Sequence, residues 1–179
     1  MRLFALVFAL IAFFALACGG PETKEALQTR SPEKKGSASV EKAAADTLVY
    51  AEKLPTWQRT SAARFRSEGH GEVFLETFVN PLGAATVGTG EVFEEGSALA
   101  AVAYPSGNES NPSFTLFMVK MPAGSNPEGG DWFFGRVEGG GLTLSGDARQ
   151  TDVSEACSNC HKFGARGTDF VFGAPRQDT

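Results

Sequence analysis

Cysteine and histidine are scarce in this chain: its 179 residues contain three cysteines and two histidines. A zinc site needs four ligands, and outside residues 157–161 the remaining soft ligands are Cys18 and His70. Positive charge is not in excess, since the formal net charge is −5, and this argues against nucleic acid or an anionic lipid surface as a partner. The longest apolar run, residues 3–17, is too short to span a membrane.

The scarce residues are concentrated in one pentapeptide, Cys157-Ser158-Asn159-Cys160-His161. C-x-x-C-H is the attachment sequence for c-type haem, in which two cysteines bond to the porphyrin and the adjacent histidine ligates the iron. Two other interpretations are a disulfide redox pair and part of a zinc site. A thioredoxin-like pair needs a βαβ context, which this sequence lacks, and gives His161 no role. We therefore predict one covalent haem c.

The N-terminus has the pattern of a secretory signal peptide. Met1-Arg2 precedes the apolar run, which ends at Ala17 before Cys18. The segment 15–18 resembles the lipobox of bacterial lipoproteins, whose cysteine becomes the acylated first residue of the mature chain, although leucine is commoner where Ala15 stands. The alternative is an ordinary signal peptide cut nearby. We expect a signal peptide at 1–17, lipidation at Cys18, and an exported protein held by lipid on the periplasmic side of a bacterial membrane.

These assignments use all three cysteines, so none is left for a disulfide framework. Residues 18–39 carry the lipidated cysteine and then a polar stretch with hardly any apolar residue, which predicts a disordered tether. Residues 40–179 are long enough for one domain with one core.

Within that domain the pattern changes from helix to strands. Helical spacing from residue 40 to about 54 ends before Pro55. Strands are predicted over four segments: 71–80, 97–104, 113–121 and 131–137. A short helix from Asp152, with Glu155 completing a capping box, then delivers the pentapeptide. The predicted fold class is α+β: mainly an antiparallel sheet of at least four strands, with flanking helices and a C-terminal haem-binding helix.

Several motifs resemble, in order and spacing, those of the cytochrome P-460 family. They are Ser67-Glu68-Gly69-His70-Gly71, the glycine-x-x-Phe-x-Glu-Gly turn at 90–96, Met118-Val119-Lys120, Gly130-Asp131-Trp132, and Ala156 to Lys162 followed by 168–172. The resemblance runs from about Tyr50 to Phe172. It implies one high-spin haem c with histidine on one side of the iron and an open site on the other. Members include hydroxylamine-oxidising cytochrome P-460 and the β-type cytochromes c′, which bind nitric oxide.

One departure from the family bears on activity. In the hydroxylamine-oxidising members, a lysine in the strand after the Phe-x-Glu-Gly turn is cross-linked to the porphyrin, whereas this chain has Ala100, Ala101 and Val102 there. Lys120, on the next strand, is a substitute that we disfavour. The resemblance therefore favours an unmodified haem with an apolar distal side, and leaves enzyme activity uncertain.

Further site candidates each have a structural alternative. Phe93 is our best distal candidate, with a core position as the alternative. His70 could be a distal group, but a structural role is favoured. Arg166 is a candidate partner for a haem propionate. Met118 and Met121 could supply axial sulfur, but core packing is commoner for strand methionines. The two tryptophans are expected to pack against the core or the haem edge.

Two function classes remain. The first is a haem protein that binds or redox-processes a small nitrogen ligand, such as nitric oxide or hydroxylamine. The second is a tethered electron-transfer cytochrome, which needs a strong sixth ligand from Met118, Met121 or His70. We also expect a redox partner protein, and a homodimer is compatible with the sequence.

Overall fold

The computed structural model describes residues 33–165 and 167–172. Helix α1 (Glu33–Lys53) and the 3₁₀ turn η1 (Leu54–Thr56) precede the short strands β1 (Gln58–Arg59) and β2 (Phe65–Ser67) and the turn η2 (Glu68–His70). The main strands are β3 (Val73–Val79), β4 (Ala98–Tyr104), β5 (Phe114–Lys120), β6 (Trp132–Glu138), after η3 (Pro127–Gly129), and β7 (Gly141–Asp147). The chain continues through α2 (Thr151–Val153), the π-helix η4 (Ser154–Ser158) and α3 (Asn159–Gly164).

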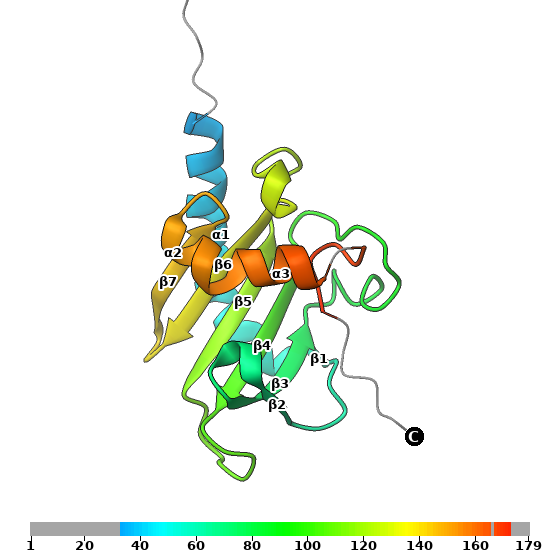
Figure 1. Ribbon diagram of the computed structural model, residues 1–179, viewed down its shortest axis with the longest axis vertical. Helices are drawn as coiled ribbons and strands as arrows, with labels where there is room; N and C mark the ends of the chain where they lie inside the picture. The colour runs from blue at the N-terminus through cyan, green and yellow to red at the C-terminus, as the bar shows by residue number, and fades with distance from the viewer. Residues whose placement is uncertain (1–32, 166, 173–179) are drawn as a thin grey trace, which may run out of the picture. The chain divides into compact units, whose positions relative to one another are not determined.

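The strands form one seven-stranded antiparallel sheet in the order β1-β3-β4-β5-β6-β7, with β2 also paired to β3. The predicted α+β class is confirmed. From β3 to β7 the strands neighbour one another in chain order. Helix α1 lies behind the sheet and the α2–α3 segment crosses its opposite face, as Figure 1 shows.

The face behind the sheet packs against α1. Ala43 and Thr47 are buried on the inner side of the helix, and the Thr47 hydroxyl donates to the Ala43 carbonyl at 2.7 Å. The helix approaches the sheet closely, because a Cβ added at Gly135 would lie 3.4 Å from the Thr47 methyl group. Trp57 packs edge-on against Phe117 in the same layer, so its predicted core position is confirmed.

A long connection between β3 and β4 is held by one amide side chain. Asn80 accepts hydrogen bonds from the backbone N–H groups of Gly83 and Ala98 and donates to the Gly96 carbonyl. It thereby joins both ends of the 81–97 connection to the start of β4. The connection includes Phe93, which packs on the face of the sheet opposite to α1.

The structure corrects several sequence predictions. α1 begins at Glu33, not Val40, so residues 33–39, assigned to the tether, belong to the helix. The short strands β1 and β2 and the glycine-bounded β7 were not predicted, because short or glycine-rich segments resemble turns. The last helical segment begins at Thr151, so Asp152 lies inside it and is not its N-cap. Within the described residues, no helix has both the length and the apolar character needed to cross a membrane.

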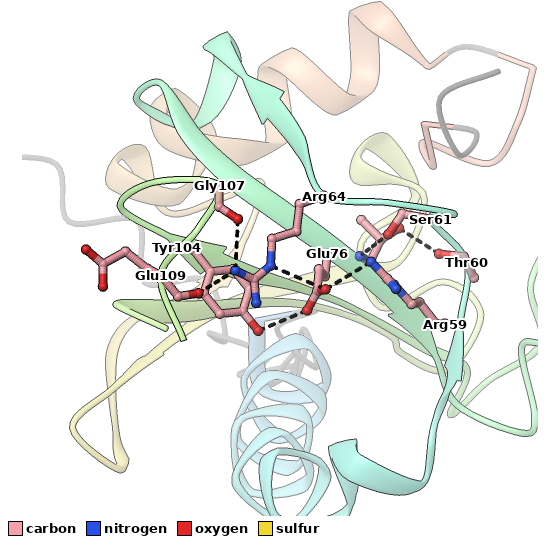
Figure 2. A network of polar contacts seen from close by, with 9 residues as sticks. Arg59, Thr60, Ser61, Arg64, Glu76, Tyr104, Gly107 and Glu109 are labelled. Carbon is pink, nitrogen blue, oxygen red and sulfur yellow. Dashed lines mark hydrogen bonds and ion pairs between the residues drawn. The ribbon is translucent and has the colours of Figure 1, made fainter. Parts of the chain in front are cut away.

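A polar network joins β3 to the segment before it and to the end of β4 (Figure 2). The Glu76 carboxylate accepts hydrogen bonds from Arg59 and from the Tyr104 hydroxyl, both at 2.9 Å, and pairs with Arg64 at 3.3 Å. The Arg64 guanidinium lies 3.5 Å from the centroid of the Tyr104 ring and also donates to the Gly107 carbonyl. Glu76 therefore ties the 58–64 segment and the loop after β4 to the centre of β3.

We expect Glu76→Gln to lower the free energy of unfolding by about 1–3 kcal/mol, because it removes a mostly buried charged acceptor shared by three partners. Glu138→Gln is the matched control, since Glu138 is 47 % exposed and pairs with Arg136; its effect should stay within about 0.5 kcal/mol. Urea unfolding followed by circular dichroism measures both. Equal effects would contradict the role of Glu76.

Candidate functional site

The pentapeptide lies where two kinds of helix meet. Cys157 is in the π-helix η4, while Cys160 and His161 are in the first turn of α3. Val153 and Ser158 are buried beneath this segment and fix it to the rest of the domain. All three predicted haem-binding side chains line one cavity.

This cavity, of about 380 Å³, lies between α3 and the front face of the sheet. Its size falls in the range of small-molecule and cofactor sites. The sheet contributes residues of four neighbouring strands, among them Leu75, Thr77, Leu99, Ala101, Leu116, Met118 and Phe134. Among the described residues that line the cavity, none is an aspartate, glutamate, lysine or arginine. The wall opposite the pentapeptide is therefore almost entirely apolar.

His161 is held in one orientation. Its Nδ1 lies 2.8 Å from the Phe170 carbonyl oxygen, which can only accept, so Nδ1 carries the proton and Nε2 is left with a lone pair. The rings of Phe134 and Phe172 pack edge-on against the imidazole at 5.5 and 5.1 Å. Burial lowers the pKa of His161, with a smaller opposing effect from the Phe170 bond. The side chain is a neutral imidazole, the form that binds a metal.

The two cysteines are unpaired. Burial, and then the charges of Asp152 and Cys160, raise the pKa of the Cys157 thiol to about 11. A redox-active cysteine pair depends on a thiol of depressed pKa, so this environment disfavours the disulfide interpretation. Within the described residues, no three histidine, cysteine, aspartate or glutamate side chains gather to hold a metal ion.

The donor set fits a c-type haem. Two cysteines and a correctly protonated histidine project into the same apolar cavity. When bound, the haem would supply a redox-active iron with positions for ligands on its two sides. Cys157 and Cys160 would hold it covalently, His161 would ligate the iron, and the apolar side chains of the sheet would cover the porphyrin.

His70 also lines the cavity. Its Nδ1 is 2.7 Å from the Ser67 hydroxyl, and its ring centroid is 6.4 Å from that of His161. Burial lowers the pKa of His70. The structure thus places the chain's two histidines side by side in the cavity lining. The hydrogen bond to Ser67 agrees with a structural role for His70, and its place in the lining keeps it a candidate distal group.

For Phe93, our distal candidate, the structure favours the alternative of a core position. Phe93 is buried, does not line the cavity, and packs edge-on against Trp132 at 5.5 Å. Its backbone N–H donates to the Asp169 carboxylate at 2.9 Å. Two neighbours therefore hold it in the core, which was the alternative, and the predicted core position of Trp132 is confirmed.

The remaining candidate residues differ in whether they line the cavity. Met118 lines the cavity, whereas Met121 is buried in the α1 layer behind the sheet and cannot reach it. Lys120 does not line the cavity, because its ammonium group is bound to Asp169. Ala101 takes part in the cavity wall. Arg166 lies outside the described residues.

Sequence reasoning missed Asp169 and Phe170. Asp169 joins Lys120, Phe93 and Trp132, and Phe170 supplies the carbonyl that orients His161. Both residues have left-handed backbone conformations, with φ of +49° and +66°. Aspartate is among the residue types that occasionally adopt such a conformation, whereas nothing in the sequence marks it for a phenylalanine.

Comparison with known proteins agrees with this geometry. The family model described as cytochrome P460 matches residues 51–173, which is more than half of the chain and includes the sheet, the cavity and the pentapeptide. No curated protein matches the chain. The family implies a haem cofactor, in agreement with the donor set of the cavity. The chain belongs to the cytochrome P460 family.

Proposed function

We propose that this protein is an exported cytochrome with a single covalent haem c, ligated by His161 on one side and open on the other, where it binds nitric oxide. A lipid on Cys18 would hold it at a bacterial membrane. The support for export and lipidation is the N-terminal sequence, since residues 1–32 lie outside the described part of the chain.

The observation that carries this proposal is the apolar cavity wall facing the pentapeptide. Among the described residues that line the whole cavity, the ionisable groups are Cys157, Cys160 and His161 of the pentapeptide and His70. Binding of a small, uncharged diatomic ligand needs an open iron site and an apolar pocket, and no proton donor or acceptor. Oxidation of hydroxylamine removes protons as well as electrons, and among the described residues of the wall His70 alone has a side chain of the kind that commonly accepts them.

The absence of the family's cross-linking lysine points the same way. Ala101 stands in the cavity wall on the strand where that lysine is expected, and the Lys120 ammonium group is bound to Asp169 at 2.6 Å. We therefore propose an unmodified haem and slow or absent turnover of hydroxylamine.

A second candidate is an electron-transfer cytochrome with a sixth protein ligand. Its support is the position of His70, whose ring lies 6.4 Å from that of His161, and of Met118 in the cavity wall. Met121 is excluded as the sixth ligand because it lies behind the sheet, in the layer of α1.

Haem attachment and lipidation are expected to depend on different cysteines. Cys157→Ala with Cys160→Ala should abolish haem staining on denaturing gels while labelled palmitate is still incorporated. Cys18→Ser should abolish palmitate incorporation while the haem stain remains. Each variant is the control for the other, and a haem stain that survives the double substitution would refute covalent attachment.

The optical spectrum of the ferrous protein separates the two candidate functions. We expect a broad high-spin spectrum that changes on adding nitric oxide or carbon monoxide and is the same in His70→Ala and Met118→Leu. Met121→Leu is the control outside the cavity. Sharp low-spin α and β bands that are lost in either cavity variant would favour the electron carrier.

The mass of the haem peptide tests the unmodified porphyrin. A tryptic digest should give one haem-containing peptide that includes Cys157 and Cys160, and none that includes Lys120. Lys120→Arg should leave this pattern unchanged, since arginine keeps the charge but cannot form the same bond. A haem linked to a second peptide would move the protein towards the hydroxylamine-oxidising members.

A further inference from the structure

The turn that follows α3 has an unfavourable backbone conformation. Asp169 and Phe170 are consecutive residues with φ of +49° and +66°. Aspartate adopts this left-handed region occasionally, but at Phe170 the Cβ crowds the backbone, so the phenylalanine adopts it only when its surroundings hold it there. The turn therefore needs an external constraint.

Asp169 receives that constraint through its side chain and its backbone. The carboxylate accepts hydrogen bonds from Lys120 Nζ at 2.6 and 2.8 Å and from the Phe93 N–H at 2.9 Å. Its carbonyl accepts from Trp132 Nε1 at 2.7 Å. The ion pair is almost dry, because the side chains of Lys120 and Asp169 are 8 % and 6 % exposed. A buried pair of this kind acts strongly on geometry, since leaving either charge alone is costly.

Lys120 is fixed in turn from the sheet. It lies on β5, donates to the Gly130 carbonyl at 2.8 Å and lies 4.9 Å from the centroid of the Trp132 ring. The Phe170 ring packs directly on Gly130, where an added Cβ would lie 2.4 Å from two of the ring carbons. The sheet thus sets the position of both Asp169 and Phe170.

The contacts of Lys120 and Asp169 fix the position of the Phe170 carbonyl group. The Phe170 oxygen lies 2.8 Å from His161 Nδ1. We infer that the Lys120–Asp169 ion pair is a positioning device: it holds the turn so that the Phe170 carbonyl accepts the Nδ1 proton of His161 and thereby tunes the axial ligand. This inference rests on the proposed role of His161 as the haem ligand.

The chemical consequence follows from the imidazole. A hydrogen bond from Nδ1–H raises the basicity of Nε2, which strengthens its bond to a metal. Stronger donation favours the ferric over the ferrous state and so lowers the midpoint potential. Releasing the carbonyl should weaken the iron–histidine bond and raise the potential.

Two substitutions that remove charges of opposite sign test this positioning role on the haem-loaded protein. Asp169→Asn and Lys120→Met both break the ion pair, so both should lower the iron–histidine stretching frequency in the resonance Raman spectrum of the ferrous protein. A through-space charge effect would act in opposite directions, because one variant loses a negative charge and the other a positive one. The stretching frequency therefore distinguishes positioning from simple electrostatics.

A third variant keeps both charges. Gly130→Ala should displace the Phe170 ring and lower the same frequency, and it decides the question if the ion-pair variants yield no haem-loaded protein. Gly124→Ala is its matched control, since Gly124 also has positive φ but its added Cβ would meet no atom within 4 Å. Glu138→Gln controls for loss of an exposed ion pair.

The outcomes separate this inference from the proposed function. A lowered frequency in Asp169→Asn, Lys120→Met and Gly130→Ala, with both controls unchanged, supports the device. Unchanged frequencies in these variants overturn it, even if their thermal stability falls, and leave the proposed function intact. If the wild-type protein shows no iron–histidine mode and His161→Gly retains its spectrum, the ligand assignment fails, and the inference fails with it.

Discussion

The central sheet has two apolar faces, and the chain covers them unequally. The rear face is closed by α1, with Ala43 and Thr47 at the contact. Over the front face run the short segments α2, η4 and α3 and the turn at 167–170, which leave a cavity of about 380 Å³. Apolar surface of this extent has to be removed from water for the sheet to be stable. The cofactor that the family implies would complete this second layer, and its binding would then stabilise the folded domain through the same surface.

The site is divided between a rigid wall and a short C-terminal segment. Leu99, Leu116 and Met118 belong to paired strands and keep their positions through the backbone of the sheet. Cys157, Cys160, His161 and the carbonyl that orients His161 belong to the segment 157–172, whose described residues contribute no strand. The ion pair between Lys120 and Asp169 joins the two parts, and it does so outside the cavity. The cavity wall can therefore remain apolar while a buried charge pair sets its geometry nearby.

Local pattern was enough to predict the parts of the structure that depend on local chemistry. The four main predicted strands match β3 to β6, and Cys157, Cys160 and His161 come together in the cavity because the spacing of the pentapeptide itself brings them together. Met118 and Met121 are three residues apart and lie on opposite sides of the sheet, as the alternation of side chains along a strand requires. Contacts between distant segments were harder to predict. The neighbours of Phe93, Trp132 and Asp169, are far from it in the chain, so no local pattern showed them. Phe170 gave no signal, because a left-handed backbone at a phenylalanine is imposed by tertiary contacts, and those of Asp169 come from residues distant in the chain.

The order of the elements along the chain bears on how the domain assembles. From β3 to β7 each strand pairs with the next, so most of the sheet can form from contacts between neighbouring segments, which close quickly. The C-x-x-C-H pentapeptide comes after the last strand and is the later part of the domain to emerge during synthesis. The strands that line the cavity can therefore pair with one another before the final segment packs over them. The buried ion pair between β5 and the final turn then joins the sheet to the part of the domain that is made last.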